Sequence, residues 1–561
     1  MKRFMMFFLA VFLIIVYGTL ASAAVEGTWT IQSTETTKLK IHGHGSENES
    51  QSVTSTWIFQ TGGIFDGDDV KGTWSQDGKK FTVSLDTAQL ADSIEADLSA
   101  DGYNTTVTVT TVSFTGKEQK NGTISGKYKF KADIIFNDLA TTGTINIKGN
   151  FTGSLSQTQI VSGNITEDTT WSGQVLLRGA VFILPPATLT IQPGTTIYGE
   201  TASIGTLIIA QGAKINAVGT QAAPIVFTSE QPEGLKARSD WGGLIINGNA
   251  PLNVPGGIAY GEGDTGVYGG NDPNDNSGTL RYVRVEYAGH EFSPENELNG
   301  IAFQGVGAGT TVDHVQVHMN KDDGIECFGG TVNFKYVIVT NIGDDCFDWT
   351  DGWQGKAQFL IAQQRGDDAD NGFEADNNQE NEDYAPRSNP TIYNVTLVGD
   401  PTANYGTESD LGMLLRHGTA AKIYNAIVVG FKDKGLEIDH ATTFAQAQAG
   451  NLIVDNSIFY NCGPGGTLPF SDDSDEKNFT PPFTTEYFAT TMMDNNATID
   501  PMLVNPYDHT NPDFRPASGS PAVNGTVPVA TPPNDGFFEQ VTFIGGVDPD
   551  NDWTAGWTVY E

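Results

Sequence analysis

The sequence predicts an all-β protein, a right-handed parallel β-helix preceded by a small antiparallel β-barrel or sandwich. Short strands separated by Gly, Asn and Asp follow one another from about residue 160, without helical periodicity. One strand pattern recurs there at intervals of about two dozen residues, as in a solenoid. Before about residue 155 the strands instead alternate apolar and polar residues between regularly spaced turns, which is typical of an antiparallel sheet.

Residues 1–24 have the features of a signal peptide. Lys2 and Arg3 precede an apolar run that ends near Val16, and the small residues around Ala23 offer a cleavage site. The run is too short to span a bilayer comfortably, and no later segment is apolar enough to do so. We therefore expect a secreted chain without membrane insertion, located outside the cell, on the outer cell surface or in the periplasm.

The charge balance restricts the partners of the chain. Its 68 acidic and 30 basic side chains give a net charge of −38. Nucleic acids and anionic membrane surfaces repel such a field, so we expect neither as a partner. Abundant acid either keeps a secreted protein soluble or collects divalent cations. Cys327, Cys346 and Cys462 are too few and too scattered for a disulfide framework, and we interpret them as packing residues.

Residues 25–155 form the predicted antiparallel domain. Strands with clear alternation include residues 27–32, 81–85 and 144–147. The Gly-Thr-Trp segments at residues 27–29 and 72–74 resemble those of small lipocalin-like domains. We expect either a lipocalin-like barrel or a sandwich.

The repeats that predict the β-helix align without ambiguity. They begin, at steps of 24, 22, 26, 40 and 23 residues, at Asn299, Asp323, Asp345, Asn371, Leu411 and Lys434. The single long step implies a looped insertion after Asp376. A coil of this length is the rung of a parallel β-helix, whose strands stack at about 4.8 Å. A propeller would need about 40 residues per blade and hairpin turns between strands. We assign the β-helix to residues 160–545 and a C-terminal tail to residues 546–561.

Strand alternation predicts what each repeat places inside and outside. Two apolar columns should fill the bore, the first including Ile325, Phe347 and Phe373 and the second Cys327, Trp349 and Ala375. The residues between them point outward and stack the acids Glu326, Asp348 and Glu374 on three consecutive rungs. Asp351 and Asp376 should lie close to this column.

Stacked acids raise one another's pKa and therefore need a physical reason. One reason is Ca²⁺, which binds about six to eight oxygen ligands; its expected ligands are Glu326, Asp348, Glu374, Asp351 and Asp376. Another is a catalytic carboxyl pair, for which Asp348 is a candidate. A third is a solvated face that discourages wrong strand pairing. The doubled acids at the turns, 322–323, 344–345 and 367–368 with Asp370, are explained either by backbone capping or by Ca²⁺.

Two of these turns carry a family resemblance. Lys321-Asp322-Asp323-Gly324-Ile325-Glu326 and Gly343-Asp344-Asp345-Cys346-Phe347 resemble polygalacturonase signatures within the pectin-lyase-like superfamily of β-helices. Residues 513–523 are similar to the closing motif of many secreted bacterial β-helix proteins. The resemblance implies that Asp323, Asp344 and Asp345 are the acid and base carboxylates. However, the Gly-His-Gly motif of that family falls on residues 370–372, which lack the His, and its Arg-Ile-Lys strand retains only Arg416.

We therefore expect a secreted carbohydrate-active β-helix that binds an extracellular polysaccharide beside an acidic Ca²⁺ site. If it is an enzyme, it is a polysaccharide lyase or a glycoside hydrolase. Arg416, His417 and Trp353 are the expected substrate-binding residues. The alternative is a non-catalytic cell-surface, adhesion or structural protein, in which the solenoid is a rigid spacer and the amino-terminal β-domain contacts a cell-surface component. The missing His favours this alternative, whereas the acids on three neighbouring rungs favour the first hypothesis.

Overall fold

The computed structural model describes residues 27–561 except residues 42–44, 61–63, 66–71, 78–79, 86, 88–90, 92–104, 119–122, 138–140, 156–157, 294–295, 403–408 and 473–483. The expected signal peptide, 1–24, lies outside the described residues. The chain divides into two compact units: residues 1–158 with residues 232–235, and residues 159–231 with residues 236–561. Within the described part of the chain, no helix combines the length and the apolar character needed to cross a membrane.

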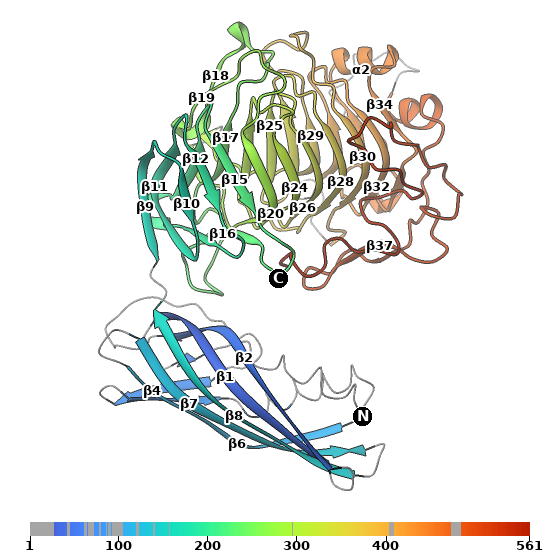
Figure 1. Cartoon of the computed structure of the whole chain (residues 1–561). Coiled ribbons are helices and arrows are strands. Elements are labelled where there is room, and N and C mark those ends of the chain that lie inside the picture. The colour runs from blue at the N-terminus through green and yellow to red at the C-terminus, as the bar shows by residue number, and fades with distance from the viewer. Residues whose placement is uncertain are drawn as a thin grey trace. The chain divides into compact units, whose positions relative to one another are not determined.

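The first unit is a closed antiparallel barrel, one of the two predicted alternatives (Figure 1). Its strands are β1 (Gly27–Ile41), β2 (Gly45–Gln60), β3 (Ile64–Phe65), β4 (Gly72–Asp77), β5 (Lys80–Leu85), β6 (Thr105–Glu118), β7 (Thr123–Phe136) and β8 (Thr141–Leu155). Each strand pairs with the next, and β8 pairs with β1 to close the barrel. In β5, Phe81, Val83 and Leu85 are buried while the residues between them are exposed, the alternation that a one-sided core imposes.

The second unit is a parallel β-helix, as predicted. Its large sheet contains 23 strands: β9 (Gln159–Ile165), β10 (Thr169–Trp171), β11 (Gln174–Ile183), β12 (Thr188–Ile191), β13 (Thr196–Gly199), β14 (Thr206–Ile209), β15 (Lys214–Val218), β16 (Ile225–Ser229), β17 (Gly243–Asn247), β20 (Gly278–Glu286), β23 (Ile301–Gln304), β24 (Thr311–His318), β25 (Ile325–Phe328), β26 (Asn333–Thr340), β27 (Phe347–Thr350), β28 (Lys356–Gln363), β29 (Asn371–Ala375), β30 (Thr391–Val398), β31 (Leu411–Leu415), β32 (Lys422–Val429), β33 (Glu437–Ile438), β34 (Ile453–Asp455) and β35 (Ile458–Tyr460).

Short strands and helices lie outside the large sheet. Three two-stranded sheets pair β18 (Ala259–Gly261) with β19 (Gly266–Tyr268), β21 (Glu291–Ser293) with β22 (Asn296–Glu297), and β36 (Leu503–Asn505) with β37 (Asp513–Pro516). The helices are η2 (Thr201–Ser203), η3 (Pro255–Gly257), η4 (Glu262–Asp264), α2 (Ala441–Gln448), η5 (Pro464–Gly466), α3 (Thr485–Tyr487) and η6 (Phe488–Met492). All of these helices are short, so the large parallel sheet makes up most of the regular structure of this unit.

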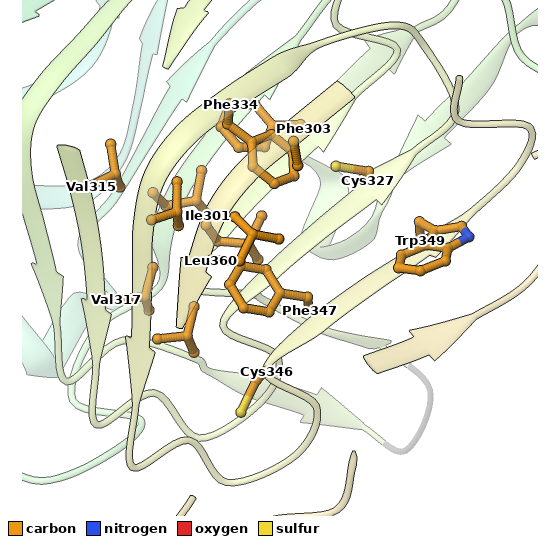
Figure 2. Close-up of a cluster of buried hydrophobic side chains, with 14 of the residues drawn as sticks. Ile301, Phe303, Val315, Val317, Cys327, Phe334, Cys346, Phe347, Trp349 and Leu360 are labelled. Carbon is orange, nitrogen blue, oxygen red and sulfur yellow. The ribbon is translucent and has the colours of Figure 1, made fainter. Parts of the chain in front are cut away.

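The bore of the β-helix is filled by the predicted inward columns. Ile325 and Phe347 are buried, and the ring of Phe347 packs edge-on against Phe373 at 5.6 Å between centroids. Figure 2 shows the side chains of neighbouring rungs converging in this core. The three cysteines are buried free thiols, in agreement with a packing role.

A column of residues with left-handed backbone conformation bends the longer strands at one corner of the rung. Tyr282, His314, Tyr336 and Phe359 have φ between 47° and 61°, a conformation that is unusual for bulky residues. Their rings stack from rung to rung, at 4.4, 4.5 and 4.8 Å between successive centroids.

The C-terminal segment, residues 503–561, covers the outside of the sheet formed by the second halves of β24, β26, β28, β30 and β32. Named parallel strands end at Tyr460, with single parallel bridges at Phe470 and Ala497. Residues 546–561, expected as a tail, pack here, since Trp557 is 1% exposed and lies edge-on to Tyr282. Gln316 both donates to the carbonyl of Val559 and accepts from its N–H, as a strand partner would. In Figure 1 this segment is red.

Candidate functional site

The predicted acidic column is present on one face of the β-helix. Parallel pairing of β23, β25, β27, β29, β31 and β33 aligns Ala302, Glu326, Asp348, Glu374, Leu414 and Glu437. Glu326 is buried, and Asp348 and Glu374 are partly buried. We call Asp322, Asp323, Glu326, Asp344, Asp345, Asp348, Asp370 and Glu374 the acidic cluster. Its members come from three rungs that follow one another in the sheet.

The acidic cluster is continuous across the rungs. Carboxylate oxygens of Asp323, Glu326 and Asp348 lie within 4.8 Å of one another. The same limit holds for Asp322, Asp323 and Asp344, and for Asp344, Asp345 and Asp370. Because these groups share members, a cation placed among them would find oxygens from neighbouring rungs.

Two of the predicted catalytic residues tie the turns together. The Asp323 Oδ1 atom accepts the backbone N–H of Asp345 at 3.1 Å, and the Asp345 Oδ1 atom accepts that of Asn371 at 2.6 Å. Both carboxyl groups are buried. This ladder is the capping role that stacked Asp and Asn residues have at turns. In the described part of the chain, the side chains of Asp344 and Asp348 accept no such ladder bond, which leaves them available to a cation or a substrate.

Burial and mutual repulsion raise the pKa values of the cluster. Burial, reinforced by Asp344, raises the pKa of Asp322 to about 8, and burial with Asp370 raises that of Asp344 to about 7. The pKa values of Asp323, Glu326, Asp345 and Asp348 also lie well above the ordinary range, mainly through burial. Without a cation, the cluster therefore retains protons near neutral pH.

The basic side chain that pairs with the acidic column lies at one end of it. Arg416 donates to Asp376 Oδ1 at 2.8 Å and forms an ion pair with Glu374. These two predicted metal ligands therefore already share one basic partner. At the other end, Asn299 donates to Glu326 Oε2 at 2.6 Å. Among the described residues, no Lys or Arg pairs with Glu326 or Asp348, and Asp348 Oδ1 is buried without a hydrogen-bond partner.

Three other expected site residues lie outside the acidic cluster: Asp351, Trp353 and His417. Burial raises the pKa of Asp351 to about 6, against the effect of an Asn378 hydrogen bond at 2.9 Å. Trp353, expected to bind substrate, is 1% exposed and stacks on Phe334 inside the bore at 5.3 Å between centroids. It offers no ring face to a sugar. His417 lies next to Asp376, with 4.0 Å between Nε2 and Oδ2.

Loops inserted between rungs add residues that the repeat pattern did not reveal. Glu262, in η4, raises the pKa of Glu326, and its own pKa is raised to about 7 by burial and by Glu297. Tyr260, in the adjoining β18, is 82% exposed and is a candidate for stacking on a sugar ring. These residues lie outside the repeat, so their spacing in the sequence carries no signal of their position.

A comparison with protein families places most of the β-helix in one family. The model of a pectate-lyase-like β-helix domain matches residues 163–501, more than half of the chain. None of the curated proteins and none of the solved structures compared with the chain gives a match. The match covers the rungs that carry the acidic cluster.

Proposed function

Because the chain belongs to the family of pectate-lyase-like β-helix domains, we propose that it is a secreted protein whose acidic cluster binds Ca²⁺ and, beside it, an extracellular polysaccharide. The fold is of the carbohydrate-active type, which supports a glycan as the ligand. The observation that carries the proposal is the group formed by Asp323, Glu326 and Asp348, whose oxygens lie within 4.8 Å of one another.

Ca²⁺ suits this group for electrostatic reasons. It prefers six to eight oxygens at about 2.3–2.6 Å and tolerates irregular geometry. The buried and unpartnered Asp348 Oδ1 is an oxygen that such an ion would satisfy. Binding would also replace the protons that the raised pKa values retain, and it would remove the repulsion between stacked acids.

The charge of the face also selects the polysaccharide. A chain of uronic acids would be repelled by the acidic cluster alone but attracted by a bound divalent cation, which can bridge sugar and protein carboxylates. The exposed Tyr260 would add a stacking surface next to Glu262. We therefore propose a carboxylated polysaccharide as the ligand class.

Catalysis is the second part of the first hypothesis. Asp322 and Asp344 have pKa values of about 8 and about 7, so each can hold a proton for a leaving group near neutral pH. The alternative, a non-catalytic surface or adhesion protein, is favoured by the capping bonds of Asp323 and Asp345.

A binding experiment tests the proposal. We expect the full chain to bind polygalacturonate in the presence of millimolar Ca²⁺ and to release it on addition of EDTA. Asp348→Asn should abolish binding, while Asp550→Asn, at an exposed site near the C-terminus, should leave it unchanged. Binding that persists in EDTA would contradict the role of the cation. The appearance of shorter oligosaccharides during incubation, or their absence, distinguishes the enzyme from the non-catalytic alternative.

A further inference from the structure

We propose that Glu382, His417 and His440 form a second metal site, which binds a divalent transition-metal ion such as Zn²⁺. Two imidazole nitrogens and one carboxylate oxygen are a ligand set that suits Zn²⁺, whereas Ca²⁺ prefers oxygen alone. The inference does not rest on the proposed Ca²⁺ and polysaccharide site, because its three residues lie outside the acidic cluster.

The repeat of the β-helix brings the two histidines together. Leu415 pairs in register with Ile438, and each histidine follows its strand residue by two positions. His417 and His440 therefore occupy equivalent turns of adjacent rungs, with φ of 48° and 68°. Their ring centroids are 4.0 Å apart and the rings are tilted by 31°. One β-helix step thus creates a histidine pair from residues that are distant in sequence.

The insertion between β29 and β30 supplies the third ligand. Glu382 Oε1 lies 3.5 Å from His417 Nδ1 and 4.0 Å from His440 Nε2. One donor atom from each of the three residues lies within 4.8 Å of the others. Two ligands on a tetrahedral Zn²⁺, with bonds of about 2.1 Å, are separated by roughly 3.4 Å. The observed separations therefore leave room for an ion after small side-chain adjustments.

Neighbouring groups orient each ligand as an outer shell does in metal sites. Asp439 Oδ1 lies 3.2 Å and the backbone N–H nitrogen of His417 lies 3.5 Å from His440 Nδ1, and these contacts hold the ring with Nε2 on the side of Glu382. Asp376 Oδ2 faces His417 Nε2 from the other side of that ring. Thr442 donates its hydroxyl to Glu382 Oε2.

The Nδ1 atom of His417 also supports the proposed metal site. This atom is buried and makes no hydrogen bond in the described part of the chain. The three side chains are 17–32% exposed, so an ion can enter and a fourth position remains open to water.

Calorimetric titration of the metal-free full chain with Zn²⁺ tests the site. We expect a Zn²⁺ site whose affinity falls at least tenfold in His417→Gln and in His440→Gln. Asp439→Asn, which removes only the orienting carboxylate, should weaken it by about tenfold. The double variant His42→Gln/His44→Gln, which alters another closely spaced pair of histidines, is the matched control and should retain the site.

Further measurements separate this site from the acidic cluster and from misfolding. Asp348→Asn should retain Zn²⁺ binding even where it loses its response to Ca²⁺. The melting temperatures of the metal-free variants should match the parent, so that lost binding cannot be assigned to unfolding. The proposal is overturned if the parent binds no Zn²⁺, or if His417→Gln/His440→Gln binds it with unchanged affinity and stoichiometry.

Discussion

Glu326 and Asp348 are register partners on the adjacent parallel strands β25 and β27, and their carboxylates share one small space with that of Asp323. Like charges in this arrangement repel, and burial strengthens the repulsion because water screens it less. The chain tolerates the arrangement by retaining protons or, as we propose, by binding a cation.

The stability of the cation-free protein should therefore fall as the pH rises from about 4 to about 8. The folded-state pKa values of Asp351, Asp344 and Asp322 are about 6, 7 and 8, above the unfolded value of about 4. Groups with raised pKa values contribute stability below the unfolded pKa and lose it as the pH passes the folded pKa. Thermal unfolding in EDTA across this range measures the effect. A melting temperature that rises through this window would contradict the assignment.

Arg416→Gln should destabilise the protein by on the order of 3 kcal/mol at pH 7, because it leaves the partly buried Glu374 and the buried Asp376 without their cation. The loss should be smaller at pH 4, where Glu374, whose pKa is raised by burial, accepts a proton more readily. Denaturant unfolding measures both. The double variant Arg416→Gln/Glu374→Gln removes one of the unpaired charges and should recover part of the stability.

Asp345→Ala should cost roughly 1–3 kcal/mol, because the buried N–H of Asn371 loses its acceptor. Asp345→Asn keeps an acceptor oxygen and should be close to the parent in stability. If Asp345 were instead a catalytic acid or base, Asn would abolish activity as completely as Ala. Comparing unfolding and glycan cleavage for the two variants separates capping from catalysis.

Trp557→Ala should destabilise the β-helix by about 3–5 kcal/mol, since it removes a buried ring from the contact between the C-terminal segment and the aromatic column at Tyr282. Val504→Ala, on an exposed part of the same segment, is the control. Equal effects of the two substitutions in denaturant unfolding would contradict this packing role.

The repeat pattern predicted the parallel fold and the acidic column because both depend only on strand period and register. Ile325 and Phe347 had to point inward, and this placed Glu326 and Asp348 side by side on the outside. Trp353 was misplaced because it follows β27 in a turn, where alternation does not apply, and its ring turns into the bore. Tyr260 and Glu382 belong to insertions, and only the folded chain shows what they lie against.

The most direct measurement of the central claim is calorimetric titration of the full chain with Ca²⁺ at pH 8. Binding should release protons from the acidic cluster, so the heat should depend on the ionisation enthalpy of the buffer. Ca²⁺ should also raise the melting temperature by mass action. Asp348→Asn should largely abolish both effects, and Asp550→Asn should preserve them. If the parent shows no Ca²⁺ heat, or if Asp348→Asn responds as the parent does, the column is a solvated face and the Ca²⁺ site is contradicted.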